Sequence, residues 1–300
     1  MTGTITRDSR GAKIFFALGF FLSAVSYLLF PVFAEAETVK TIQRGTLTRG
    51  FATYPEITLN PSVNPDNTLV LCRFRNNASA IAQSPLCELL NSTTLKVVLG
   101  TTDVGTQPNQ TEWEVLEFDH NVKVQRDVLQ IPLATATTTV TIESVDLTRA
   151  FVLITTTASS TSTTIDEEFT IRARLLNATT LELGRNETGI AVDVSWQVIE
   201  MNSASVQSNI ASINEGLGTT TAALAPAVDV SRSFVVLTVA ASQDSAGFDG
   251  QYEVRGELNA AGHAYFGAYR HFAKRGHCLV CSDHERHYPG SEWHPRNRRR

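Results

Sequence analysis

Four residues near the end of the chain are of the types that bind zinc. They follow the pattern Cys278-x-x-Cys281-x-x-His284-x-x-His287, and thiolate and imidazole are the ligands of structural zinc sites. The spacing is not that of a common zinc finger, and six of the seven histidines fall in this final segment. A basic, disordered tail is the interpretation we prefer, so we predict no metal and no other cofactor.

Two further cysteines, Cys72 and Cys87, flank a polar loop in the first half of the chain. In an exported protein such a pair favours a disulfide, which we predict. It would close a short loop and contribute about 3 kcal/mol in the chain-entropy description. The alternative is two buried free thiols.

Several carboxylate groups are of the type that carries out general acid–base catalysis. Asp166–Glu168 form an acidic run, and Glu117 and Glu200 recur at one position of a repeat. Glycoside hydrolysis needs two carboxylates at a set separation in a cleft, and solvated positions are the simpler interpretation. The chain has no Gly-x-Ser-x-Gly, phosphate-binding loop, dinucleotide fingerprint or His-Glu-x-x-His. We therefore predict a protein that is not an enzyme and has no catalytic residues.

The elements that would position these residues are strands. Residues Val192–Val198 alternate strictly between apolar and polar, and Phe169–Leu175 do the same with Arg172 and Arg174 outward. A period of two indicates strands with one dry and one wet face. Val, Ile and Thr dominate, and about six strands fit in Val122–Met201. We predict an all-β fold in which this segment is a six-stranded antiparallel sandwich.

The sandwich occurs three times. Gln43, Gln125 and Gln207 lie 82 residues apart each time. Three further motifs recur in the same order, one in all three repeats and two in repeats 1 and 2. The chain therefore divides as follows: signal peptide 1–36, repeat 1 at 37–119, repeat 2 at 120–203, partial repeat 3 at 204–261, and a basic His/Cys tail at 262–300.

The third repeat departs from the pattern after about Gly262, where its last two strands are expected. The tail is either a native segment or the product of a shifted reading frame relative to an ancestral third repeat. Without those strands the third repeat has open sheet edges, which invite pairing with another chain. We expect it to be poorly ordered or completed by a partner strand.

Alternation slips by one residue after each repeated tryptophan. The slip gives the adjacent apolar pairs Val115-Leu116 and Val198-Ile199. It indicates either a β-bulge or a strand end that a neighbouring repeat buries on both faces. The short junctions at 119–121 and 202–205 favour repeats that pack in a fixed relation.

The N-terminal segment has the layout of a secretory signal peptide. Arg7, Arg10 and Lys13 precede the apolar run Ile14–Phe33, and Ala34-Glu35-Ala36 offers a cleavage site. The alternative is an uncleaved anchor, because the run is near the ~20 residues that span a bilayer. We predict a secreted or cell-surface protein with no membrane contact after cleavage. The net charge of −5 also argues against nucleic acid as a partner.

The order of features within one repeat resembles the H-type lectin domain, a six-stranded antiparallel sandwich. The residues that carry this resemblance are Val124-Gln125-Arg126, Phe151-Val152-Leu153, Arg172-Ala173-Arg174 and Val194-Ser195-Trp196. It also looks like repeat modules of bacterial surface and phage fibre proteins. The H-type lectin family forms trimers and binds sugars between adjacent domains, so the resemblance implies glycan binding at the repeat junctions. Three repeats would form a pseudo-trimer or a linear stack. No sugar-contacting residue is carried over.

Two hypotheses follow for function. The first is an exported recognition protein that binds surface glycans or mediates adhesion. The second is a structural subunit of an extracellular fibre or surface layer, which self-associates through repeat contacts or the incomplete third repeat. Fold analogy does not decide between them.

Overall fold

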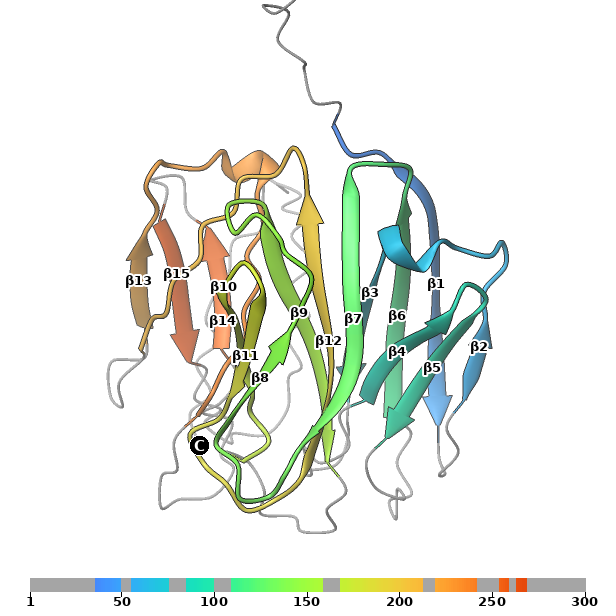
Figure 1. Cartoon of the computed structure of the whole chain (residues 1–300), viewed down its shortest axis with the longest axis horizontal. Coiled ribbons are helices and arrows are strands. Elements are labelled where there is room, and N and C mark those ends of the chain that lie inside the picture. The colour runs from blue at the N-terminus through green and yellow to red at the C-terminus, as the bar shows by residue number, and fades with distance from the viewer. Residues whose placement is uncertain are drawn as a thin grey trace, which may run out of the picture. The chain divides into compact units, whose positions relative to one another are not determined.

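A computed structural model describes residues 36–49, 55–75, 85–99, 109–158, 168–212, 219–241, 254–258 and 263–268, and in these ranges the chain is built almost entirely of strands (Figure 1). The prediction of an all-β fold is confirmed. The strands in the range predicted as repeat 1 are β1 (Val39–Arg49), β2 (Glu56–Thr58), β3 (Thr68–Arg75), β4 (Pro85–Asn91), β5 (Thr94–Leu99) and β6 (Asn109–Phe118), and the names of the predicted repeats are kept below for these ranges. Those of repeat 2 are β7 (Val122–Ile131), β8 (Thr137–Thr141), β9 (Ala150–Ala158), β10 (Arg172–Asn177), β11 (Thr180–Gly184) and β12 (Val192–Met201). In repeat 3 they are β13 (Thr219–Ala223), β14 (Val254–Leu258) and β15 (His263–Ala268). Two short 3-10 turns, Pro65–Asn67 and Val230–Arg232, precede the third strand position of repeats 1 and 3.

The strands form three-stranded antiparallel sheets with one recurring order. Repeat 1 has the sheets β1-β6-β3 and β2-β5-β4, and repeat 2 has β7-β12-β9 and β8-β11-β10. In both pairs the last strand lies at the centre of the first sheet, and the fifth strand lies at the centre of the second. The sheet β13-β15-β14 of repeat 3 has the order of the second sheet.

A glutamine side chain links the first strand position to the turn after the second in each repeat. In all three cases its amide oxygen accepts a backbone N–H and its amide nitrogen donates to a backbone carbonyl, at 2.7–3.0 Å. The partners are Asn60 and Pro61 for Gln43, Glu143 for Gln125, and Ala225 and Pro226 for Gln207. The recurring glutamine therefore fixes the equivalent loop in each of the three repeats.

Repeats 1 and 2 each have an apolar core, which lies between the two sheets of that repeat. In repeat 2, Val192 and Val194 of the central strand are fully buried and Trp196 is 5% exposed. Leu181 and Leu183 of β11 meet them from the other sheet. Residues at alternate positions of each strand build this core, as the period of two predicts.

The phase slip in the central strands is not a bulge. β12 pairs with β7 and β9 in continuous register through Val198 and Ile199. Val198 packs in the core of repeat 2, whereas Ile199 belongs to a separate apolar cluster with Leu69 and Phe118 of repeat 1. The second explanation therefore holds: the neighbouring repeat buries the other face of the strand end.

Gly45 of β1 lies directly against an aromatic ring. A Cβ atom at this position would come within 2.7 Å of the Trp113 indole. We expect Gly45→Ala to cost about 1–3 kcal/mol of unfolding free energy, because the rigid ring has to move. Gly184→Ala is the matched control, since its Cβ would meet nothing closer than 3.5 Å. Equal urea midpoints for the two variants would contradict this prediction.

The third repeat extends further than the sequence predicts. β15 begins at His263, beyond the boundary at 261, and pairs with both β13 and β14. One of the two strands that we expected to be missing is therefore present. Within the described ranges, repeat 3 has no counterpart of the central strands β6 and β12, and residues 233–241 belong to no sheet.

The predicted signal peptide and nearly all of the predicted tail lie outside the described residues. None of the helices in the described ranges is long and apolar enough to span a membrane.

Candidate functional site

The predicted cysteine pair lies where the two sheets of repeat 1 approach each other. Cys72 of β3 and Cys87 of β4 form a disulfide with an S–S distance of 1.96 Å and a Cα–Cα distance of 6.5 Å. Register and repeat spacing place Ile154 and Ala173 at the same positions of repeat 2, and both pack against its core. One structural position is thus filled either by a covalent bond or by a large and a small apolar side chain.

The recurring carboxylates have a structural role. Glu117 is 1% exposed and accepts hydrogen bonds from Lys40 Nζ at 2.8 Å and from the Asn64 N–H at 3.0 Å. Glu200 accepts from the Asp146 N–H at 2.8 Å, at the equivalent turn of repeat 2. Each carboxylate therefore holds the turn that precedes the third strand of its repeat.

Most of the other residues that the sequence suggests for chemistry lie outside the described part of the chain. Asp166, Glu167 and the zinc-type residues Cys278, Cys281, His284 and His287 lie outside the described residues. In the portion of the chain that the structure describes, His, Cys, Asp and Glu side chains form no group of three that could hold a metal ion.

A polar contact joins repeat 2 to the free edge of β3 in repeat 1. The Val70 N–H donates to Gln197 Oε1 at 2.9 Å, and Gln197 Nε2 donates to the Val70 carbonyl at 2.9 Å. β3 is the outer strand of its sheet, so these backbone groups have no ladder partner. Because Gln197 is only 6% exposed, its amide replaces a neighbouring strand in a dry environment.

The edge strand of the other sheet is capped in the same way. The Cys87 N–H donates to Thr155 Oγ1 at 3.1 Å, and Ser195 Oγ donates to the Cys87 carbonyl at 3.0 Å. Ser195 and Gln197 come from alternate positions of β12, and Thr155 comes from the adjacent β9. The strand face that alternation predicts to be wet is therefore buried against repeat 1.

Arg126 of β7 completes the junction from the side. Its Nη2 donates to the Pro65 carbonyl at 2.6 Å and to the Thr68 carbonyl. Burial lowers the pKa of this guanidinium to about 10, with Asp66 acting weakly in the opposite direction. The group is still cationic at neutral pH. Its Nη1 is buried and has no hydrogen-bond partner in the described part of the chain.

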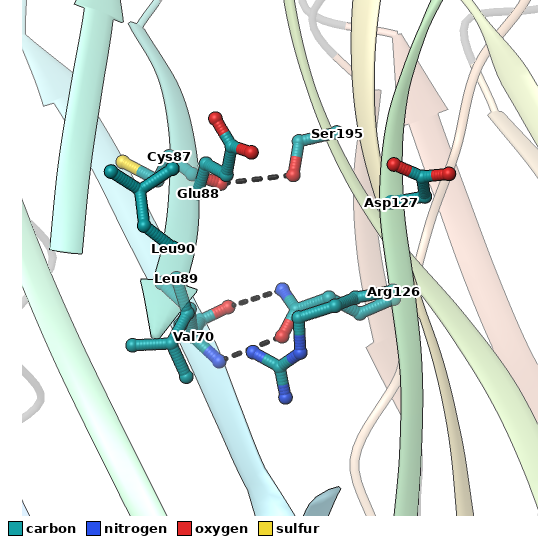
Figure 2. Close-up of a pocket in the computed structure, with 9 residues that line it drawn as sticks. Val70, Cys87, Glu88, Leu89, Leu90, Arg126, Asp127 and Ser195 are labelled. Carbon is teal, nitrogen blue, oxygen red and sulfur yellow. Dashed lines mark hydrogen bonds between the residues drawn. The ribbon is translucent and has the colours of Figure 1, made fainter. Parts of the chain in front are cut away.

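A cavity of about 210 Å³ lies between these contacts (Figure 2). Repeat 1 supplies one wall from β3 and β4, and repeat 2 supplies the other from β7 and β12. Glu88 and Asp127 bring one carboxylate from each wall, and Leu90 adds exposed apolar surface, whereas the Leu89 side chain packs in the core of repeat 1. The lining residues are Val70, Cys87, Glu88, Leu89, Leu90, Arg126, Asp127, Ser195 and Gln197.

The junction between repeats 2 and 3 repeats part of this arrangement. Thr238 Oγ1 accepts from the Ala173 N–H at 3.0 Å and donates to the Ala173 carbonyl at 3.1 Å. Ala173 is the counterpart of Cys87, and Thr238 is the counterpart of Thr155. Phe234 also meets Phe151 edge to face, with ring centroids 5.7 Å apart. At both junctions, therefore, a threonine of the later repeat caps the equivalent edge strand of the preceding repeat.

Sequence reasoning did not find the cavity or its polar residues. Ser195 and Gln197 have the composition and spacing of an exposed strand face, and Arg126 lies in a motif that indicated the family resemblance and no contact between repeats. The phase slip at Ile199 was the one signal that this end of the strand meets another repeat. No family model, curated protein or solved structure matches the chain.

Proposed function

We propose that this chain is an exported, non-enzymatic recognition protein that binds a glycan in the cavity between repeats 1 and 2. The observation that carries the proposal is the cavity itself, which is lined by side chains that accept hydrogen bonds and by others that donate them. Glu88 and Asp127 offer carboxylate acceptors, and Arg126 Nη1 is a donor without a partner in the described residues.

This chemistry suits sugar hydroxyls. Hydroxyl groups both donate and accept, so different hydroxyls of one sugar can bond to the carboxylates and to the guanidinium. The exposed Leu90 side chain would contact the C–H face of a sugar ring. The cavity is smaller than the roughly 300–1,000 Å³ of typical small-molecule sites, which favours one sugar unit held at the end of a longer chain. Two carboxylates disfavour a polyanionic glycan.

The predicted address supports a role outside the cell. A disulfide such as Cys72–Cys87 persists in oxidising compartments, and the sequence predicts a signal peptide. H-type lectins bind sugars between adjacent domains, so the resemblance of the sequence pattern to that family also favours a site between repeats. These points favour surface glycans as the ligand class.

The proposal is tested by a glycan array followed by calorimetric titration of the best neutral ligand. We expect Glu88→Gln with Asp127→Asn to weaken binding at least tenfold, because hydrogen bonds to charged groups contribute about 1.5–3 kcal/mol each. Glu56→Gln, an exposed carboxylate of β2 away from the cavity, is the matched control and should bind as the wild type does. Binding that is unchanged in the double variant would refute the cavity as the site.

A structural subunit of an extracellular fibre or surface layer is the second candidate. The observation that favours it is the recurrence of one edge-capping contact, Thr155 to Cys87 and Thr238 to Ala173, in the same sense along the chain. Head-to-tail contacts of this kind can propagate between molecules. Regular polymers in negative-stain images, together with an array that shows no glycan binding, would favour this function over the first.

A further inference from the structure

Among its described residues, the third repeat has a gap where repeats 1 and 2 have a central strand. In those repeats a ten-residue strand, β6 or β12, lies between the first and third strands of the first sheet. Repeat 3 keeps its second sheet complete and keeps the Gln207 contact that positions its first segment. Its third segment, residues 233–241, is described and belongs to no sheet.

Both faces of this third segment are more open than their counterparts. Phe234 is 70% exposed, whereas Leu69 at the same position of repeat 1 is 7% exposed. Val235 is half-buried, whereas Val70 and Val152 at its position are 4% and 8% exposed. In repeats 1 and 2 the central strand pairs with the valine at this position, so the absence of that strand from the described residues explains the exposure of Val235. Leu69 is also covered by Ile199 of the following repeat, and Phe234 has no such cover among the described residues.

The two intact repeats define the strand that fits the gap. It has a tryptophan at the fifth position (Trp113, Trp196), a core valine at the seventh (Val115, Val198) and a glutamate at the ninth (Glu117, Glu200). That glutamate accepts the N–H of Asn64 or Asp146, and Asp229 is the counterpart in repeat 3.

The sixth position connects the gap to the junction with repeat 2. In β12 this residue is Gln197, which caps the backbone of Val70 on the edge of repeat 1. Val152 is the counterpart of Val70 and lies on the edge strand β9. The Thr238 half of this junction is already formed, so a strand in the gap with glutamine at its sixth position would supply the other half.

The residues after Ala268 do not have this pattern. No ten-residue window of 269–300 combines apolar residues at the fifth and seventh positions with a glutamate at the ninth. The only tryptophan there, Trp293, has Pro289 and Pro295 close on either side, and proline removes the N–H that a central strand needs.

We propose that the first sheet of repeat 3 accepts a strand from another polypeptide, an extended segment with the pattern of β6 and β12. Such strand addition takes its affinity from main-chain hydrogen bonds and its specificity from alternate side chains. The proposal does not depend on the glycan site, which lies between repeats 1 and 2.

The test uses the chain from Glu37 to Arg300 and a labelled synthetic peptide with the sequence Val192–Met201. We expect one peptide to bind per chain and to protect residues 206–268 from trypsin. A control peptide that carries W196D and V198D should bind at least tenfold more weakly, because both residues face the core. Equal binding of the two peptides, or none, would overturn the proposal.

A second arm addresses the tail and the folding of the repeat. If the peptide binds only a chain that ends at Ala268, the tail fills the gap itself and the proposal is wrong. In a chain where residues 185–203 replace 269–300, the strand is supplied in cis, and we expect the same protection without peptide. A graft that leaves residues 206–268 as sensitive to trypsin as before would also count against a missing strand.

Discussion

Replacing Gln197 with alanine is expected to lower the free energy of unfolding by about 2–4 kcal/mol and to uncouple repeat 1 from repeat 2. The substitution leaves the N–H and the carbonyl of Val70 buried without partners, and each unsatisfied group costs about 1–3 kcal/mol. Urea denaturation followed by tryptophan fluorescence measures the effect, since Trp113 reports on repeat 1 and Trp196 on repeat 2. We expect the wild type to unfold in one transition and the variant in two.

Gln130→Ala is the matched control for this prediction. Gln130 lies on the neighbouring strand β7, is exposed and donates to Asp193 Oδ1 at 3.0 Å. An exposed hydrogen bond of this kind contributes little, so its loss should change the unfolding free energy by less than about 0.5 kcal/mol. If the two variants unfolded alike, the capping of β3 by Gln197 would not be what couples the repeats.

The same residues show how much of this fold can be predicted from sequence. Alternation specifies which positions of a strand face its own core, and Val192, Val194 and Trp196 lie where the pattern places them. The recurrence of motifs likewise anticipates the recurring sheet order. These features depend on local periodicity, which a single sequence displays directly.

The junction could not be predicted, for a physical reason. It is formed by polar side chains that bond to backbone groups of another repeat, and backbone groups leave no signature in the sequence. Ser195, Gln197 and Thr155 therefore read as solvent-facing residues, although Ser195 and Gln197 are buried. β15 was missed because its sequence differs from β5 and β11, while its pairing with β13 and β14 follows the same topology.

Replacing Cys72 and Cys87 together with alanine is expected to lower the unfolding free energy of repeat 1 by about 4–5 kcal/mol. Loss of the cross-link accounts for about 3 kcal/mol of this, given a sequence separation of 15 residues. The rest is the cost of the space that the sulfur atoms leave in the core. Urea denaturation of the oxidised wild type and of the variant measures the difference.

Repeat 2 provides the variant that separates these two contributions. Cys72→Ile with Cys87→Ala copies the pair Ile154 and Ala173, which fills the same position without a covalent bond. We expect it to recover about 1–2 kcal/mol relative to the double alanine variant, since it restores packing and not the cross-link. The reverse exchange, Ile154→Cys with Ala173→Cys, should form a disulfide in repeat 2 and raise its stability by about 3 kcal/mol. If that pair remained reduced in oxidising buffer, the residue pairs 72/87 and 154/173 would not occupy equivalent positions in the two repeats.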